Sequence, residues 1–162
     1  MNKQASVCIR EIKAEDLEAI VNLFRETVHH VNVKDYTSEQ LFVWAPLHMH
    51  HSDARWKSLL DNIAYLVEID DVIVGFADSS TEGYLDRLFV HKDYQRQGIA
   101  SQLVKKLESL LLLRGVKKIT TEASITAKPF FERIGYFVVK EQNKPRSGGV
   151  TLTNFLMEKQ LG

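Results

Sequence analysis

The chain has 162 residues, a length that fits one domain and suffices to bury a core without a metal or disulfide to hold it. Its 21 basic and 21 acidic side chains balance to zero net charge, which argues against a broad basic surface for nucleic-acid binding. Cys8 is the single cysteine, so an internal disulfide is excluded. Without a signal-like N-terminus or a long apolar run, we expect a cytoplasmic protein with no membrane partner.

The first third of the chain predicts one strand followed by three helices. Apolar and polar residues alternate over residues 7–12, which favours a short strand. Apolar positions spaced three and four apart then predict a helix over residues 15–31. A second helix is expected to begin near Thr37 and to end at Pro46, because the residue before a proline avoids the helical region. A third, short helix is expected over residues 52–60.

Three runs rich in β-forming residues follow closely, at residues 64–69, 72–77 and 84–91. The first two are separated by Asp70 and Asp71, which is a hairpin signal. Short connections join neighbouring strands, so we expect these three runs to form an antiparallel meander.

A long amphipathic helix comes next, and Gly115 is placed to end it. A strand over residues 117–124 follows, and because the helix crosses between them, the strands at 84–91 and 117–124 should run parallel. The chain is completed by a short helix at 128–134 and strands at 136–141 and 150–158. The order β-α-α-α-β-β-β-α-β-α-β-β predicts a mixed α/β fold with a single domain over residues 1–162.

The junction between the third meander strand and the long helix reads VHKDYQRQGIAS and has the properties of an anion site. The first N–H groups of a helix lack intrahelical partners, and the helix dipole adds positive potential there. Gly98 and Ala100 are small enough to let a pyrophosphate approach the backbone, and Arg96 offers a charge-assisted contact. The plain alternative is a polar helix start. The chain has neither a P-loop nor the dinucleotide-binding glycine pattern.

Two motifs give this junction a family context. The Q-x-x-G-x-A spacing that begins at Gln95 resembles the CoA-pyrophosphate loop of GNAT N-acetyltransferases, and it follows a strand that ends in the aliphatic Val90. Downstream, SITAKPFFERIGY at residues 124–136 is similar to a second family pattern, N-x-x-A-x-x-F-Y-x-x-x-G-F. Residues 29–46 and 149–159 look similar to a YafP-like subgroup.

The resemblance implies a GNAT acyl-CoA N-acyltransferase fold, in which a mostly antiparallel central sheet with one splayed parallel pair is flanked by helices. It also implies transfer of an acetyl group from acetyl-CoA to a primary amine of a small molecule or peptide by direct attack. The motif positions carry the following cofactor-binding residues over to this chain: Leu88, Phe89, Val90, Gln95, Arg96, Gln97, Gly98, Ile99, Ala100, Ser101, Ser124 and Phe131. A backbone N–H near Val90 would stabilise the charge that develops on the thioester oxygen.

Two of these positions depart from the family pattern. Ser124 replaces an asparagine, and it is shorter but still able to form hydrogen bonds. Phe131 replaces a tyrosine proposed to protonate the leaving thiolate, and phenylalanine has no proton to donate. A module that binds acyl-CoA without turnover is therefore an alternative function.

The general base is less constrained. Strict alternation places four side chains of one strand on the same face: Tyr84, Asp86, Leu88 and Val90. Asp86 and Tyr84 are candidate catalytic residues, with pairing of Asp86 to Arg87 and packing of Tyr84 as the alternatives. His29 is a third candidate because it matches a histidine of the subgroup, with a surface or capping role as the favoured alternative.

Other residues have alternative roles. Aromatic residues near Trp44 line either the acceptor pocket or the core. The histidines at 48, 50 and 51 form a suggestive cluster with Asp53, but no further ligand is evident and we expect no metal. Arg146 lies in a basic turn that is solvated or contacts the CoA 3′-phosphate or an acidic acceptor. An enzyme that acetylates aminoacyl-tRNA is a further alternative that the neutral charge disfavours, and the resemblance leaves a homodimer open.

Overall fold

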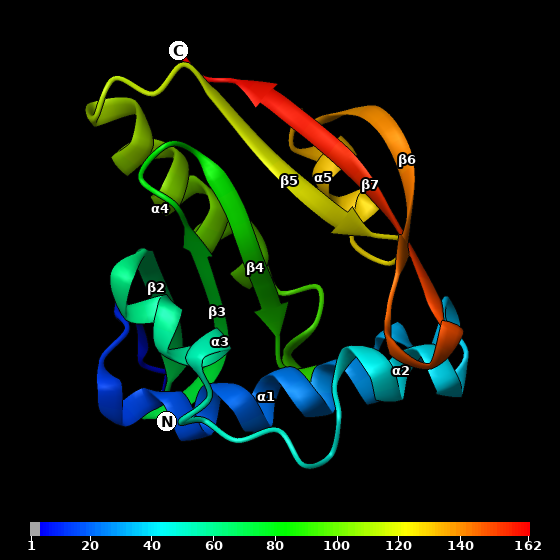
Figure 1. The fold of residues 1–162 in the computed structure, drawn as a ribbon. Coiled ribbons are helices and arrows are strands. Elements are labelled where there is room, and N and C mark those ends of the chain that lie inside the picture. The colour runs from blue at the N-terminus through cyan, green and yellow to red at the C-terminus, as the bar shows by residue number, and fades with distance from the viewer. Residues whose placement is uncertain (1–3) are drawn as a thin grey trace.

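Seven strands form one mixed sheet in the computed structural model, which describes residues 4–162 (Figure 1). The strands are β1 Val7–Glu11, β2 Ile63–Ile69, β3 Val72–Ser79, β4 Tyr84–Val90, β5 Lys118–Ser124, β6 Phe137–Pro145 and β7 Thr151–Gln160. The helices are α1 Leu17–His30, α2 Ser38–Trp44, α3 Ala54–Lys57, α4 Ile99–Leu113 and α5 Lys128–Arg133. Strands and α-helices follow the predicted order, and the predicted mixed α/β fold is confirmed.

The spatial order of the strands is β1-β2-β3-β4-β5-β7-β6, so β7 lies between β5 and β6. Strands β1 to β4 form the predicted antiparallel meander. Asp70 and Asp71 have φ values of 50° and 66° between β2 and β3. A two-residue type I′ hairpin turn requires a positive φ at both central residues, and Asp adopts a positive φ more readily than most residues.

Helices cover both faces of the sheet, and the alternation of side chains along the strands assigns each face its own core. Leu66 and Phe76 pack in the cluster that contains the apolar face of α1, whereas Val67 and Ala77 pack in the cluster that contains α4. Successive strand residues point to opposite faces, so one strand supplies both cores. Phe24 of α1 is fully buried, as its place on the predicted apolar face requires.

The second hairpin, β6 with β7, is longer than the sequence predicts. β6 continues to Pro145, where we expected the strand to end at residue 141 and a polar turn to follow. The paired register runs from Phe137 with Glu158 to Pro145 with Thr151, because the ten-residue β7 offers a partner along its whole length. Pro145 is tolerated since it ends an edge strand, where its missing N–H removes no necessary hydrogen bond.

The parallel contact between β4 and β5 is short. Only two residue pairs join the strands, Tyr84 with Thr120 and Leu85 with Thr121. Beyond them the two strands separate, as Figure 1 shows, with β4 running toward α1 and β5 toward the β6–β7 turn. This divergence confirms the predicted splayed pair.

Strict alternation along β4 is wrong at Asp86. The register with β3 shifts between Asp78 and Ser79, so that β3 pairs with Arg87 and then with Leu85, and Asp86 has no partner there. Leu85 consequently packs in the same cluster as Leu88, which an unbroken strand would place on the opposite face. An extra residue of this kind is a β-bulge, which changes the direction of a side chain without ending the strand.

Candidate active site

A cavity of about 1170 Å³ opens where β4 and β5 separate. Its walls come from both sides of the gap and from helices α1 to α5, including the first residues of α4. Most of the predicted site residues line it. Those that do are Tyr84, Asp86, Leu88, Phe89, Val90, Gln95, Arg96, Gly98, Ile99, Ala100, Ser101, Ser124 and Phe131.

The loop before α4 has the backbone shape of an anion site. Arg96 has a φ of 59° and Gly98 a φ of 81°, so two left-handed residues precede the helix start. Such turns bring successive N–H groups together in a concave arrangement, and the first N–H groups of a fifteen-residue helix have no partner within it. A Cβ built on Gly98 would meet nothing within 4 Å, so open space lies on that side of the loop. A backbone arrangement of this kind is suited to binding an anion.

Two glutamines of the loop differ in their surroundings. Gln95 turns its side chain back onto β4, where Nε2 donates to the carbonyl oxygens of Val90 at 2.6 Å and His91 at 3.3 Å. Gln95 therefore holds the loop against the strand end with its side chain. Gln97 is exposed and is absent from the cavity lining, unlike the other predicted residues of the loop.

The free edge of β4 faces the gap. His91 N–H donates to Val74 O of β3, and because backbone directions alternate along a strand, Leu88 and Val90 turn theirs toward β5. The carbonyl oxygen of Val90 already accepts from Thr27 Oγ1 of α1 at 3.2 Å. The backbone of Leu88 and the N–H of Val90 lie beyond the last β4–β5 pair, so they are placed to bind an extended arm.

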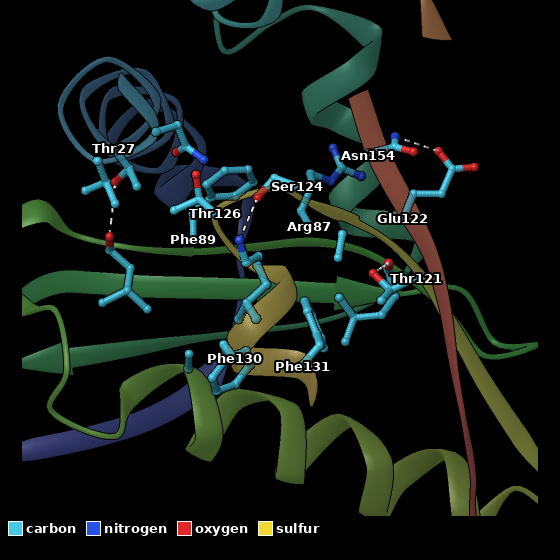
Figure 2. A pocket seen from close by; sticks show the side chains of 18 of the residues that line it. Thr27, Arg87, Phe89, Thr121, Glu122, Ser124, Thr126, Phe130, Phe131 and Asn154 are labelled. Carbon is cyan, nitrogen blue, oxygen red and sulfur yellow. Dashed lines mark hydrogen bonds between the residues drawn. The ribbon is translucent and has the colours of Figure 1, made fainter. Parts of the chain in front are cut away.

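The family departures have different consequences in the structure. Ser124 Oγ accepts from Ala127 N–H at 3.0 Å and so stabilises the turn before α5 while it lines the cavity. Phe131 is 2% exposed and packs edge-on against Phe130 and Tyr136, on the α4 side of the site (Figure 2). Its position carries no hydroxyl, so this part of the cavity wall is apolar.

The opposite side of the cavity carries the titratable groups. Tyr84 is partly exposed, and burial, followed by the nearby charges of Glu122 and Asp86, raises the pKa of Tyr84 to about 12. Its phenol therefore keeps its proton at neutral pH and is able to donate a hydrogen bond. Asp86 is 44% exposed at the bulge, with Oδ2 3.3 Å from Arg87 Nη2. Asp86 therefore lines the cavity, as a catalytic role requires, and it also lies close to Arg87, as the alternative of an Asp86–Arg87 ion pair requires.

A buried ion pair positions this region. Arg87 donates Nε and Nη2 to the two carboxylate oxygens of Asp78 at 3.0 and 2.9 Å, and both residues are at most 7% exposed. Burial raises the pKa of Asp78, while its bonds to Arg87 oppose that shift. Arg87 also donates to Arg55 O and Ser58 Oγ, at 2.7 and 3.0 Å. One side chain therefore fastens α3 to β4 beside Asp86.

His29 lies away from this group. Its Nε2 is 2.8 Å from Ala45 O, and its ring packs against Phe42 at 5.0 Å between centroids. Because His29 is not part of the cavity lining, its surroundings fit the capping alternative, and we leave it out of the proposed machinery. Trp44 does line the cavity, whereas Phe42 is 49% exposed outside it.

Sequence reasoning missed several lining residues. Glu122 of β5 accepts from Asn154 Nδ2 at 3.4 Å, and Figure 2 shows this pair across the site from Phe130. Arg55 of α3 also lines the cavity, although it is 31 residues before Asp86 in sequence. The alternation of KITTEAS was a usable signal for Glu122, because it places that side chain on the same face as Ser124. Nothing local distinguished Arg55.

Two further expectations concern features outside the cavity. Among residues 4–162, no three His, Cys, Asp or Glu side chains gather closely enough to hold a metal ion, and His50 Nδ1 lies 2.6 Å from Ser52 Oγ. No helix in that same part of the chain is both long and apolar enough to cross a membrane.

Comparison with known proteins agrees with this geometry. A family model described as acetyltransferase (GNAT) domain matches residues 32–160. The uncharacterized N-acetyltransferase YafP of Escherichia coli strain K12 is 35% identical over 153 residues, which cover 94% of this chain and 95% of that protein. A crystal structure of a GCN5-related N-acetyltransferase from Rhodopseudomonas palustris has a TM-score of 0.89 and 27% identity, and covers 99% of this chain and 100% of that chain. PaiA N-acetyltransferase from Thermoplasma acidophilum, solved with coenzyme A, has a TM-score of 0.76 and 19% identity, with 96% and 99% covered. These matches confirm the predicted membership: the chain belongs to the GNAT acetyltransferase family.

Proposed function

We propose that this chain binds acetyl-CoA between β4 and β5 and transfers the acetyl group to a primary amine of its acceptor. The observation that carries the proposal is that the loop around Gly98 and the free edge of β4 open into one cavity. The coenzyme A bound to the PaiA relative, which has the same fold, supports the choice of cofactor.

The cofactor contacts follow from the backbone. In this proposal the N–H groups at the start of α4 hold the pyrophosphate, and Arg96 adds a cation there. Leu88 and Val90 pair with the pantetheine arm as a neighbouring strand would. The N–H of Val90 stabilises negative charge on the thioester oxygen during attack. Acetyl-CoA, when bound, supplies an acetyl group on a thiol that leaves readily.

The acceptor amine must lose a proton before or during attack. An amine with a pKa of about 10.4 is deprotonated at pH 7 at a cost of roughly 4.6 kcal/mol. We assign Asp86 as the carboxylate that receives this proton, because it is exposed to the cavity at the β4 bulge. Glu122 is the second carboxylate in the lining and the alternative base. Tyr84 stays protonated and orients the amine as a hydrogen-bond donor.

The attack is direct in this proposal, without a covalent acyl-enzyme. Cys8 is the only thiol of the chain, and it lies on β1 at the far edge of the sheet from the cavity. The leaving thiolate needs no proton from the Phe131 position, because a thiol has a pKa of only about 8.5.

The test combines calorimetric titration with a thiol-release assay over a panel of amines. The proposal expects acetyl-CoA to bind and at least one primary amine to release free CoA from it. Binding of acetyl-CoA without thiol release on any amine would overturn the transfer step and favour an acyl-CoA-binding module. Absence of measurable acetyl-CoA affinity would overturn the cofactor assignment itself.

A further inference from the structure

We propose that the acceptor carries a carboxylate besides its amine, and that Arg55 and Arg146 bind this carboxylate at the acceptor end of the cavity. The inference rests on the proposed function, which supplies the acetyl transfer, and it adds the chemical class of the acceptor: a small amino-acid-like molecule.

Arg55 has a fixed position and no acidic partner. Its guanidinium lies 5.0 Å from the ring centroid of Phe24 and 5.2 Å from that of Trp56, so two aromatic faces hold it at the cavity wall. Its one hydrogen bond to another residue is a long one, from Nη1 to Trp44 O at 3.5 Å. No carboxylate within residues 4–162 lies within 4.0 Å of its guanidinium nitrogens.

Arg146 reaches the same cavity from the turn between β6 and β7. It has no ion-pair partner among the residues that the structure describes, and its side chain bonds only to the neighbouring Pro145 O at 3.2 Å. Burial lowers the pKa of Arg55, and the positive charges of Arg87 and Arg146 lower it further, while the negative charge of Asp86 opposes the shift. Two arginines that repel each other at one wall favour an anion between them.

Basic side chains outnumber acidic ones in the cavity lining. Six basic and two acidic side chains line it, in a chain whose total charge is zero. Arg87 is neutralised by Asp78 and Asp86, and Arg96 belongs to the pyrophosphate loop. Four basic side chains of the lining remain without an ion pair in the described part of the chain: Lys34, Arg55, Arg133 and Arg146. Of these, Arg55 and Arg146 are the two whose charges act on one another, and their guanidinium forks suit a planar carboxylate.

The cofactor phosphates lie on the other face of the sheet. Phe24 and Trp56, which hold Arg55, belong to the α1 core, whereas Ile99 at the pyrophosphate loop belongs to the α4 core. The β6–β7 turn is also on the α1 side, where Gln40 Nε2 of α2 donates to Thr151 O at 2.8 Å. Because the cofactor phosphates lie on the α4 side in this proposal, the acceptor enters from the α1 side, where the two arginines lie.

The proposed base stands beside this pair. The hydrogen bond from Arg87 Nη1 to Arg55 O fixes α3 against β4 next to Asp86. An acceptor held by its carboxylate on Arg55 and Arg146 would present its ammonium group to Asp86. The arginines thus bind the carboxylate of a short zwitterion, and Asp86 binds its ammonium group. An amine without an acidic group would leave the two arginines without an anion.

The experiment compares matched acceptors on the intact protein. L-amino acids, their carboxamides and the corresponding decarboxylated amines are assayed for thiol release with saturating acetyl-CoA. We expect kcat/KM for the best amino acid to exceed that of its carboxamide at least tenfold. In Arg55→Gln and Arg146→Gln this preference should fall at least tenfold each, about 1.4 kcal/mol, while the Kd for acetyl-CoA stays unchanged.

Matched controls are Lys57→Gln, on the same helix as Arg55, and Lys140→Gln, on the strand before Arg146; both lysines are exposed and lie outside the cavity lining. Both should keep the wild-type preference. Arg55→Gln removes packing on Phe24, so its melting temperature is measured as well, and Arg146→Gln, in an exposed turn, tests the idea without that complication.

Two results would overturn the inference while leaving acetyl transfer intact: carboxamides or decarboxylated amines used as well as the amino acids, or acetylation of decarboxylated amines with no amino acid acetylated. A loss of acetyl-CoA affinity in the arginine variants would also overturn it, because the arginines would then hold the cofactor phosphate. Failure of acetyl-CoA binding in the wild-type protein would instead remove the proposed function first.

Discussion

The two ends of the cavity are built in different ways. The end around Gly98 consists of backbone groups from one continuous segment, shaped by two left-handed residues before α4. The other end consists of side chains from separate segments, among them Arg55 of α3, Asp86 of β4 and Glu122 of β5. In the proposed function, cofactor binding at the first end depends mainly on backbone groups, whereas acceptor binding at the second end depends on each side chain.

The acceptor end should be more sensitive to loss of a single supporting residue. In Arg87→Leu the buried carboxylate of Asp78 loses its partner, and we expect the free energy of unfolding to fall by about 3–5 kcal/mol. Because burial already raises the pKa of Asp78, the unpaired carboxyl takes up a proton more readily in the folded state. The deficit relative to wild type should therefore shrink as the pH falls from 8 to 5.

Urea titrations at several pH values measure that deficit. The double variant Arg87→Leu with Asp78→Leu is the control, since it removes both charges and should recover much of the lost stability. A deficit under 1 kcal/mol in the single variant would contradict a supporting role for the pair.

Catalysis should fail at the acceptor end without loss of cofactor binding. Asp86→Asn removes the proposed base, and we expect kcat to fall about 100-fold while the Kd for acetyl-CoA is unchanged. A thiol-release assay measures kcat. The control is Asp61→Asn, because Asp61 is exposed and lies outside the cavity lining. If Glu122→Gln gave the larger loss instead, the base would be Glu122.

The contribution of Tyr84 should be smaller. Tyr84→Phe removes a donor that stays protonated, because its pKa of about 12 lies well above the assay range. We expect kcat to fall about tenfold, by an amount that is constant between pH 7 and pH 10, since about 1.4 kcal/mol is a typical hydrogen bond. If the kcat of the wild-type protein instead rose with pH as Tyr84 ionised, and the kcat of Tyr84→Phe did not, Tyr84 would be a base.

The smallest effect is expected at the cofactor end. Gln95→Leu removes the side-chain bonds that hold the loop to Val90 O and His91 O, which should weaken acetyl-CoA binding about fivefold, or ~1 kcal/mol. Gln97→Leu is the matched control, because the neighbouring glutamine is exposed and lies outside the cavity lining. Equal affinities of the two variants would contradict the role assigned to Gln95.

The same contrast explains what the sequence could predict. Hydrophobic spacing and turn residues predicted the strand and helix order, and the Q-x-x-G-x-A spacing marked the loop at Gln95, because these signals are local. The register shift at Asp86 carries no local signal, so strict alternation fails between Leu85 and Arg87, although Leu88 and Val90 share one core as it predicts. Arg55 is held at the site by tertiary contacts, among them the hydrogen bond from Arg87 to its carbonyl oxygen and its packing on Phe24, and hydrophobic periodicity does not reveal such contacts.

The measurement that tests the account most directly compares two glycines for acetyl-CoA binding. Gly98 and Gly115 have φ values of 81° and 82°, and a Cβ on either would meet nothing within 4 Å. Valine at either position therefore introduces the same backbone strain, but only the valine at position 98 enters the proposed pyrophosphate cradle. By calorimetry, Gly98→Val should bind acetyl-CoA at least tenfold more weakly, about 1.4 kcal/mol, and Gly115→Val should bind it as wild type does. Wild-type affinity in Gly98→Val, or an equal loss in both variants, would contradict a cofactor held by the start of α4.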